Sequence, residues 1–154
     1  MPLIWNHPGK IPSGRAVPSM VSSYDFFPTI LEYLGAPVPR AGRRPGKSYT
    51  RLLREDAPDW RNRLYLEYGY VRGLRSRNLK YIERTREWPS ELYDLEADPG
   101  ESKNVIADKA YGEVVAKLRA ELGDFFRRSG APPIEEWRRT VRQRHLDTHQ
   151  RVTP

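Results

Sequence analysis

Histidine is the first side chain to consider for acid–base or metal chemistry, and this sequence has three. His145 and His149 lie four residues apart, a spacing that places two rings on one face of a helix and recurs in metal sites. No Glu follows His145 directly and no third ligand is evident, so a solvent-exposed pair is favoured over a metal site. His7 precedes Pro8-Gly9 just after a short apolar run, where active-site loops of α/β folds emerge. A plain loop histidine is the competing interpretation of His7.

Nucleophiles and phosphate-binding loops have no recognisable signature here. The chain has no cysteine, which excludes disulfides, cysteine metal sites and a cysteine nucleophile. No serine lies in a Gly-x-Ser-x-Gly elbow, and Gly46-Lys47-Ser48 lacks the upstream glycine and the preceding strand of a phosphate-binding loop. Five acids between positions 91 and 101 alternate with Leu and Tyr, which indicates a solvated edge and not a metal cage. We therefore predict no catalytic and no metal-binding residue.

Arginine is the remaining signal, because its planar guanidinium binds sulfate and phosphate through two parallel hydrogen bonds. The chain carries 27 Lys and Arg against 20 Asp and Glu, a net charge of +7 that favours nucleic acid, acidic lipid, or sulfated and phosphorylated partners. Basic side chains fall on or between two predicted strands, interleaved with two tyrosines: Arg72, Arg75, Arg77, Lys80, Tyr70 and Tyr81. A solvated sheet face is the competing interpretation of this group.

The elements that position His7 come first along the chain. Its 154 residues suit one domain, and 14 Pro with 11 Gly make loops a large share of it. Leu3–Trp5 has the composition of a buried strand. Residues 25–34 predict a helix, with Asp25 as its cap, Pro28 in its first turn and one apolar face. A basic loop over residues 36–63 follows, with eight Lys or Arg against three acids and one helical turn near 49–53.

The elements that position Arg72 follow from residue 64 onward. Short aromatic and β-branched runs predict strands at 64–68, 71–75, 79–82 and 91–95, which must pair antiparallel because the connections are too short for crossover helices. Apolar residues at helical spacing predict a long helix over 108–129, ended by Gly130 and Pro132-Pro133. In the tail, Ile134, Trp137 and Val141 suit a short helix, and fraying is expected beyond Arg144.

Four blocks of motifs stand in a recognisable order: Pro2-Leu3-Ile4 with Pro8-Gly9-Lys10, Asp25 with Pro28-Thr29-Ile30-Leu31, Val71-Arg72 with Lys80-Tyr81-Ile82, and Glu91-Leu92-Tyr93-Asp94-Leu95 with Asp98-Pro99-Gly100-Glu101. From Pro2 to about Phe126, they resemble the C-terminal third of the sulfatases, of the N-sulfoglucosamine sulfohydrolase and arylsulfatase type, in the alkaline-phosphatase-like superfamily. The tail after Gly130 carries no motif of this resemblance.

The resemblance implies an α+β piece of an α/β alkaline-phosphatase-like fold. A small antiparallel sheet of about four strands would pack on a long C-terminal helix. Leu3–Trp5 and the helix 25–34 would be one strand and one helix left over from the large central sheet. The expected divisions are a remnant of the large α/β domain at 1–35, the basic loop at 36–63, the sulfatase C-terminal subdomain at 64–130 and a basic tail at 131–154.

The resemblance also implies that the reactive part lies elsewhere. Sulfatases use a formylglycine, made in a Cys/Ser-x-Pro/Ala-x-Arg motif, and a calcium ion held by Asp and Asn or His. In the family these groups precede the segment that opens this sequence. The nearest serine motif here, Ser13-Gly14-Arg15, fails. No catalytic residue or calcium ligand is carried over, and no cofactor is predicted within this chain.

The function implied is a C-terminal sulfatase fragment that flanks the substrate cleft and is inactive alone. His7, Tyr70 and Arg72 are predicted to line that cleft, with a sulfated small molecule or polysaccharide as partner once a catalytic half is joined. We also expect marginal folding, since exposing each large apolar side chain that the central sheet would cover costs about 1.5–3 kcal/mol.

Two alternatives stay open. The charge and the Arg-rich tail with Trp137 would suit a small basic module for nucleic acid or sulfated polysaccharide, although the basic residues are spread out and no nucleic-acid motif occurs. A subunit that complements a separate catalytic half is the other, since Leu3–Trp5 could add to an incomplete sheet. No apolar run approaches the ~20 residues of a membrane span. Without a signal peptide, we expect a cytoplasmic location by default, although the parent family is often exported.

Overall fold

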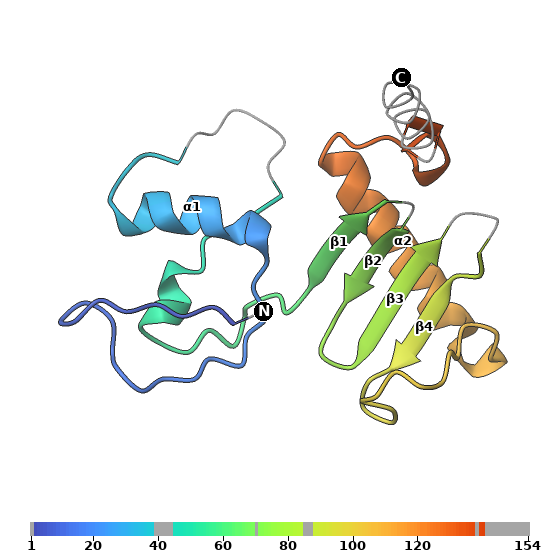
Figure 1. Cartoon of the computed structure of the whole chain (residues 1–154), viewed down its shortest axis with the longest axis horizontal. Helices are drawn as coiled ribbons and strands as arrows, with labels where there is room; N and C mark the ends of the chain where they lie inside the picture. Colours follow the sequence, from blue (N-terminus) through green and yellow to red (C-terminus); the bar gives the residue numbers. More distant parts are fainter. Residues whose placement is uncertain (1, 39–44, 70, 85–87, 138, 141–154) are drawn as a thin grey trace, which may run out of the picture. The chain divides into compact units, whose positions relative to one another are not determined.

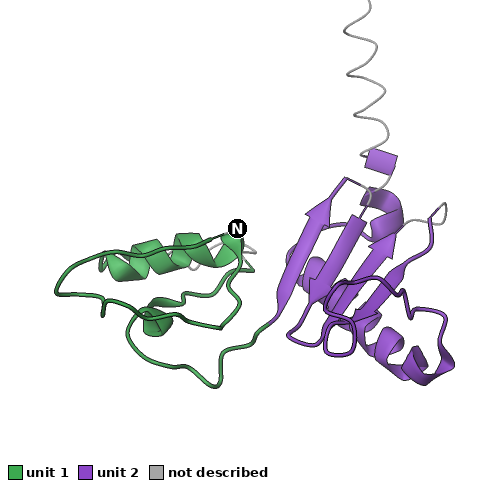
Figure 2. Ribbon diagram, turned by 60° about the horizontal axis from the view of Figure 1, so that its bottom comes forward, with its two compact units in different colours: residues 1–62 green, residues 63–154 purple. Residues whose placement is uncertain are grey.

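The computed structural model describes residues 2–38, 45–69, 71–84, 88–137 and 139–140. The chain divides into two compact units, residues 1–62 and 63–154 (Figure 2). Unit 1 contains helix α1 (Ser23–Tyr33) and the 3₁₀ turn η1 (Thr50–Leu53), and unit 2 contains a four-stranded sheet and helix α2 (Gly112–Arg128) (Figure 1). Within the described ranges, no helix is both long enough and apolar enough to cross a membrane.

A small aromatic core holds unit 1 together. Its buried residues are Tyr49, Leu52 and Ala57, against which Trp5, Val21, Leu53 and Trp60 pack. The indole N–H of Trp60 donates to the carbonyl of Met20 at 2.8 Å, and the indole N–H of Trp5 donates to the Tyr49 hydroxyl at 3.3 Å. These two bonds tie the N-terminal segment to the second half of the unit. The turn η1 confirms the helical turn predicted near 49–53.

The buried face of α1 is polar. Ser22 is the N-cap, and its backbone N–H donates to the Asp25 carboxylate at 2.9 Å in a capping box. The same carboxylate accepts the Lys47 backbone N–H at 2.7 Å and the Arg61 guanidinium at 3.1 Å. Asp25 is only 1% exposed. This one side chain therefore joins the start of α1 to two later segments of unit 1.

Thr29, one turn after Asp25, extends this polar contact. Its hydroxyl donates to the Asp25 carbonyl at 2.5 Å and accepts the Tyr49 backbone N–H at 3.0 Å. The chain also passes so close that a Cβ on Gly46 would lie 1.8 Å from the Tyr24 carbonyl oxygen. The motif Asp25-x-x-Pro-Thr29 thus supplies the buried polar contacts of α1, and Gly46 is required by close packing, not by phosphate binding.

The helix prediction needs two corrections. The helix begins at Ser23 and ends at Tyr33, so Asp25 occupies its third position and Ser22 is the cap. Pro28 lies inside the helix, beyond the first turn. The sequence signal was ambiguous because Ser22 and Asp25 are both good cap residues and a capping box uses both.

The predicted strand at Leu3–Trp5 is not formed. A strand needs a hydrogen-bonded neighbour, and no described segment pairs with these residues. The predicted apolar face of α1 is also largely uncovered, with Phe27 44% and Leu34 70% exposed. Leu3–Trp5 and α1 are the two elements that the resemblance assigns to the large central sheet of the family.

The sheet of unit 2 has the predicted meander. Strands β1 (Leu64–Tyr68), β2 (Val71–Arg75), β3 (Leu79–Arg84) and β4 (Glu91–Asp94) are antiparallel neighbours in that order. Leu74 faces Tyr81 across β2–β3, and Tyr81 faces Leu92 across β3–β4. These three side chains are 0% exposed and form the centre of one sheet face.

Helix α2 covers this face and completes the core of unit 2, as Figure 1 shows. Leu118, Leu122, Phe125 and Phe126 are its buried residues. The ring of Phe125 stacks on Tyr65 with 3.8 Å between ring centroids. A separate 3₁₀ turn, η2 (Lys109–Tyr111), precedes α2, so the helix predicted over 108–129 is divided at Gly112. Residues 134–137 and 139–140 are helical as well.

Candidate substrate-binding region

His7 lies in a tight turn of unit 1. The backbone N–H groups of Lys10 and Ile11 donate to the His7 carbonyl at 3.1 and 3.0 Å, and Gly9 has a φ of +77°. The His7 ring is held by α1, because its Nδ1 atom and the Tyr33 hydroxyl share a 2.5 Å hydrogen bond. This hydrogen bond fixes the direction of the His7 ring.

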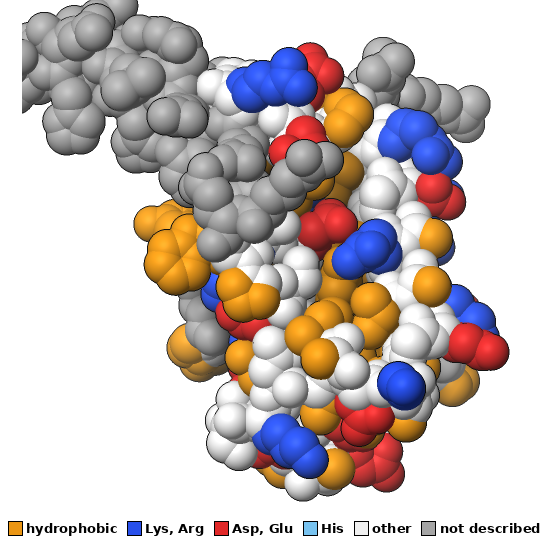
Figure 3. All heavy atoms as spheres, turned by 90° about the vertical axis from the view of Figure 1, so that its right-hand side faces the viewer, with side chains coloured by type: hydrophobic (Ala, Val, Ile, Leu, Met, Phe, Trp, Pro, Cys, Tyr) orange, Lys and Arg blue, Asp and Glu red, His pale blue; other side chains and the backbone are white. Residues whose placement is uncertain are grey.

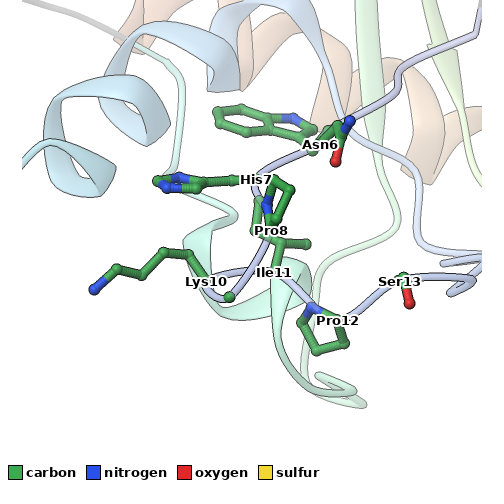
Figure 4. A pocket seen from close by; sticks show the side chains of 9 residues that line it. Asn6, His7, Pro8, Lys10, Ile11, Pro12 and Ser13 are labelled. Atoms are coloured by element: carbon green, nitrogen blue, oxygen red, sulfur yellow. The ribbon is translucent and has the colours of Figure 1, made fainter.

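A hollow of about 570 Å³ runs along this turn and is lined by Trp5–Ser13 (Figure 4). Figure 4 shows the side chains of His7 and Lys10 extending to the same side of the loop. An imidazole and an ammonium group on one side of a hollow offer hydrogen-bond donors and positive charge to an anionic ligand. The predicted site residue His7 is therefore placed where it can meet a solute.

Trp5 fixes the start of this turn. Its ring lies 5.4 Å from the Tyr33 ring, 6.1 Å from the Phe26 ring and 6.1 Å from the Tyr49 ring, measured between centroids. Burial raises the pKa of the Tyr49 hydroxyl, and the Trp5 hydrogen bond partly opposes this. The aromatic packing orients the residue two positions before His7, although it forms no strand.

Arg72, the second predicted site residue, is 3% exposed. Its Nε donates to Glu67 at 2.7 Å, its Nη1 donates to the Pro132 carbonyl at 2.8 Å, and its guanidinium carbon lies 4.2 Å from the centroid of the Phe126 ring. Its Nη2 has no hydrogen-bond partner in the part of the chain that the structure describes. The predicted substrate contact of Arg72 stays a prediction, and the third predicted residue, Tyr70, lies outside the described residues.

The other basic residues of the sheet are paired, in agreement with the solvated-face interpretation. Arg75 and Lys80 both bind the carboxylate of Glu101, and Arg84 binds Glu91 at 2.8 Å. On the side of the molecule drawn in Figure 3, Lys and Arg side chains alternate with acidic and hydrophobic ones and form no continuous basic surface. His145 and His149 lie outside the described residues.

The acids near β4 support the chain and do not form a cation site. Glu101 has a left-handed φ of +55° in the Asp98-Pro99-Gly100 turn, and its two ion pairs hold it against the sheet. Backbone N–H groups, that of Lys103 first, lower the pKa of Asp98. The Tyr111 hydroxyl donates to Asp94 at 2.7 Å and lowers the pKa of that carboxyl.

No group of three or more His, Asp or Glu side chains in the described ranges could hold a metal ion. Asp94, Asp98 and Glu101 each bind a hydrogen-bond donor or a cation of this chain, and the resemblance places the calcium ligands before the segment that opens the sequence.

Sequence reasoning missed the contacts of the segment after α2. The sequence predicts a helix stop at Pro132 and a short helix around Trp137, but not that both contact the β1–β2 hairpin. No local pattern could have shown this, because the partners of Pro132 and Trp137 are 60 and 68 residues away.

Comparisons with known proteins match most of this chain. Residues 1–128 match the family model described as N-sulphoglucosamine sulphohydrolase, C-terminal. The chain is 32% identical over 143 residues to the Delta 4,5-hexuronate-2-O-sulfatase of Bacteroides thetaiotaomicron, covering 84% of this chain and 29% of that protein.

Two solved structures are also similar to this chain. One, in complex with its substrate D-glucosamine-2-N,6-O-disulfate, is 27% identical with a TM-score of 0.58, over 69% of this chain and 24% of that one. The phosphonate monoester hydrolase of Agrobacterium radiobacter is 25% identical with a TM-score of 0.66, over 76% and 27%. The chain therefore spans less than a third of the length of these relatives.

Proposed function

The chain belongs to the sulfatase family, whose C-terminal region it matches, and from this membership we propose that it forms one side of the substrate cleft of a sulfuric ester or sulfamate hydrolase. The match over residues 1–128 is the observation that carries the proposal. A relative that binds a glucosamine disulfate supports a sulfated saccharide as the ligand class.

The hollow along Trp5–Ser13 is the part of the chain proposed to meet that ligand. Lys10 supplies positive charge to a sulfate oxygen, and His7 supplies a ring nitrogen whose orientation is fixed by Tyr33. Substrate contact by Tyr70 and Arg72, the predicted site residues of unit 2, stays a separate prediction. The role of His7 and Lys10 is binding and orientation of the sulfated group.

Calorimetric titration with D-glucosamine-2-N,6-O-disulfate tests this binding role. The double variant His7→Ala/Lys10→Ala should bind roughly tenfold more weakly, since two polar contacts to an anion are lost. Lys117→Ala is the matched control, because Lys117 is an 80% exposed lysine on α2 in the other unit. Equal affinity of the double variant and the parent chain would remove His7 and Lys10 from the site.

These 154 residues are further proposed to be catalytically silent by themselves. Ester hydrolysis needs a nucleophile and groups that stabilise charge on the transferred group. The sequence offers no cysteine and no Ser-x-Pro/Ala-x-Arg motif. Assays of aryl and sugar sulfates, with and without calcium, should detect no inorganic sulfate; its release by the purified chain would contradict the proposal.

A complementing subunit is the second candidate, and the exposed apolar side chains of unit 1 favour it. Ile4 is 85% exposed, Leu34 is 70% exposed and Leu3 is 50% exposed. Covering this apolar surface with a larger sheet would lower the free energy of the assembled protein. Mixing this chain with the upstream two-thirds of a family enzyme should then restore sulfate release, and Ile4→Asp should abolish the restoration.

A further inference from the structure

The chain reverses direction directly after α2. Gly130 has a φ of +77°, the Ala131 N–H donates to the Phe126 carbonyl at 2.9 Å, and the Gly130 N–H donates to the Arg127 carbonyl at 3.0 Å. This is the geometry of a Schellman ending, which turns the chain back along the helix. Residues 131–137, named the strap here, then run towards the β1–β2 hairpin.

The first end of the strap closes over Arg72. The Pro132 carbonyl accepts the Nη1 hydrogen bond of Arg72 at 2.8 Å, and the Trp137 ring centroid lies 6.0 Å from the guanidinium carbon. The guanidinium carbon also lies 4.2 Å from the centroid of the Phe126 ring. Arg72 thus lies among the strap, α2 and its own strand, and Glu67 on β1 compensates its charge.

The second end of the strap binds the turn between β1 and β2. The Trp137 indole N–H donates to the Gly69 carbonyl at 3.0 Å, and the Trp137 backbone N–H donates to the Pro133 carbonyl at 2.9 Å. Gly69 has a φ of +53°, a conformation that favours glycine. The strap is therefore bound to the β1–β2 turn through Gly69 and to strand β2 through Arg72.

We propose that the strap fixes the β1–β2 turn, with Trp137 and Arg72 as positioning residues. The strap lies beyond residue 128, where the match to the family model ends, and it belongs to the fold of unit 2. Next to Gly69, Tyr68 is 84% exposed, and its presentation depends on this turn. The consequence for ligand binding, though not the strap itself, rests on the proposed function.

Hydrogen exchange of the turn amides in the full chain tests the strap. In Trp137→Ala, the amides of Gly69 and Val71 should exchange roughly tenfold faster, because a buried tether is lost. Trp137→Phe keeps the ring without the N–H donor, so exchange should be intermediate. Glu136→Ala, an exposed neighbour on the strap, is the matched control. Unchanged exchange in Trp137→Ala would overturn the proposal.

Arg72→Lys tests the other tether without removing the charge. A lysine can still pair with Glu67 but cannot present the planar fork that also reaches Pro132. Exchange of the strap amides, that of Trp137 first, should then become faster while the α2 amides stay protected. Equal protection of the strap in Arg72→Lys would show that Arg72 does not hold it.

Titration with D-glucosamine-2-N,6-O-disulfate separates this inference from the proposed function. Faster turn exchange with weaker binding in Trp137→Ala supports both. Faster exchange with unchanged binding keeps the strap and removes the turn from the cleft. No binding by the parent chain contradicts the proposed function, and the exchange data then decide the strap alone.

Discussion

Glu83 is a half-buried carboxyl whose pKa depends on the charges around it. It lies on β3, with the Arg119 guanidinium of α2 at 3.7 Å, Arg72 on β2 and Glu135 on the strap. Burial raises the pKa of Glu83 above its ordinary value of 4.5; Arg119 and Arg72 partly oppose this, and Glu135 adds to it. The folded chain therefore holds the Glu83 proton more tightly than the unfolded chain does.

Glu83→Gln should become more stable relative to the parent chain as pH rises. Between pH 4.5 and the raised folded pKa, the unfolded chain has lost its proton and the folded chain retains it, so the parent's free energy of unfolding falls through this window. A neutral glutamine has no such loss. Urea unfolding of both proteins at pH 4 and pH 8 measures the difference.

Glu113→Gln is the control for this pH dependence, because the Glu113 side chain on α2 is 92% exposed. Its stability difference from the parent chain, measured at both pH values, is the reference for the Glu83→Gln difference. A Glu83→Gln difference that does not grow from pH 4 to pH 8 would show that burial does not control this carboxyl.

At the scale of secondary structure, α1 is held by hydrogen bonds where an apolar face would be expected. Asp25 and Thr29 are its buried residues, while Phe26 and Phe27 on the same helix are 47% and 44% exposed. The segment around Tyr49 is bound through backbone N–H groups, so its position depends on the Thr29 hydroxyl and the Asp25 carboxylate.

Thr29→Val should destabilise unit 1 by about 1–3 kcal/mol, since it keeps the shape of the side chain but leaves the Tyr49 N–H buried without an acceptor. Hydrogen exchange at the Tyr49 amide measures this directly. Thr29→Ser retains the hydroxyl and should preserve protection at Tyr49. Protection at Tyr49 that survives in Thr29→Val would show that the Thr29 hydroxyl does not hold this segment.

The sequence predicted elements well where the signal is local. Short aromatic and β-branched runs along 64–95 located all four strands, and the helical spacing from residue 111 to 125 located α2. It failed where a partner is distant or absent: Leu3–Trp5 is strand-like but has no pairing partner in the described ranges, and Arg72 meets Pro132 across 60 residues. Of the predicted site, His7 lies beside a hollow and its substrate contact stays a prediction, whereas the burial of Arg72 depends on contacts that no sequence period encodes.

At the scale of the whole molecule, the two units differ in their cores. Unit 2 has a cluster of eight buried hydrophobic residues with α2 against the sheet, whereas the unit 1 cluster has three. Stability depends on apolar area removed from water, and a small core rarely offsets the entropy of ordering the chain. The expected marginal folding is therefore concentrated in unit 1.

Expressed separately, residues 63–140 should unfold in a single cooperative transition, whereas residues 1–62 should show none. Circular dichroism melts and the dispersion of amide proton shifts measure this for each piece. A cooperative melt of residues 1–62 at low concentration would contradict it, because it would show that Asp25, Thr29 and three buried hydrophobic side chains suffice.

Each unit also carries an indole whose N–H is bound to a distant carbonyl, Trp60 to Met20 and Trp137 to Gly69. Fluorescence emission from an indole shifts when its surroundings become aqueous, so these two rings are natural optical reporters. Replacing Trp5 and Trp60 by Phe would leave unit 2 as the emitter, and replacing Trp88 and Trp137 would leave unit 1. The emission wavelength of the remaining tryptophans can thus report the unfolding of each unit, with no attached dye.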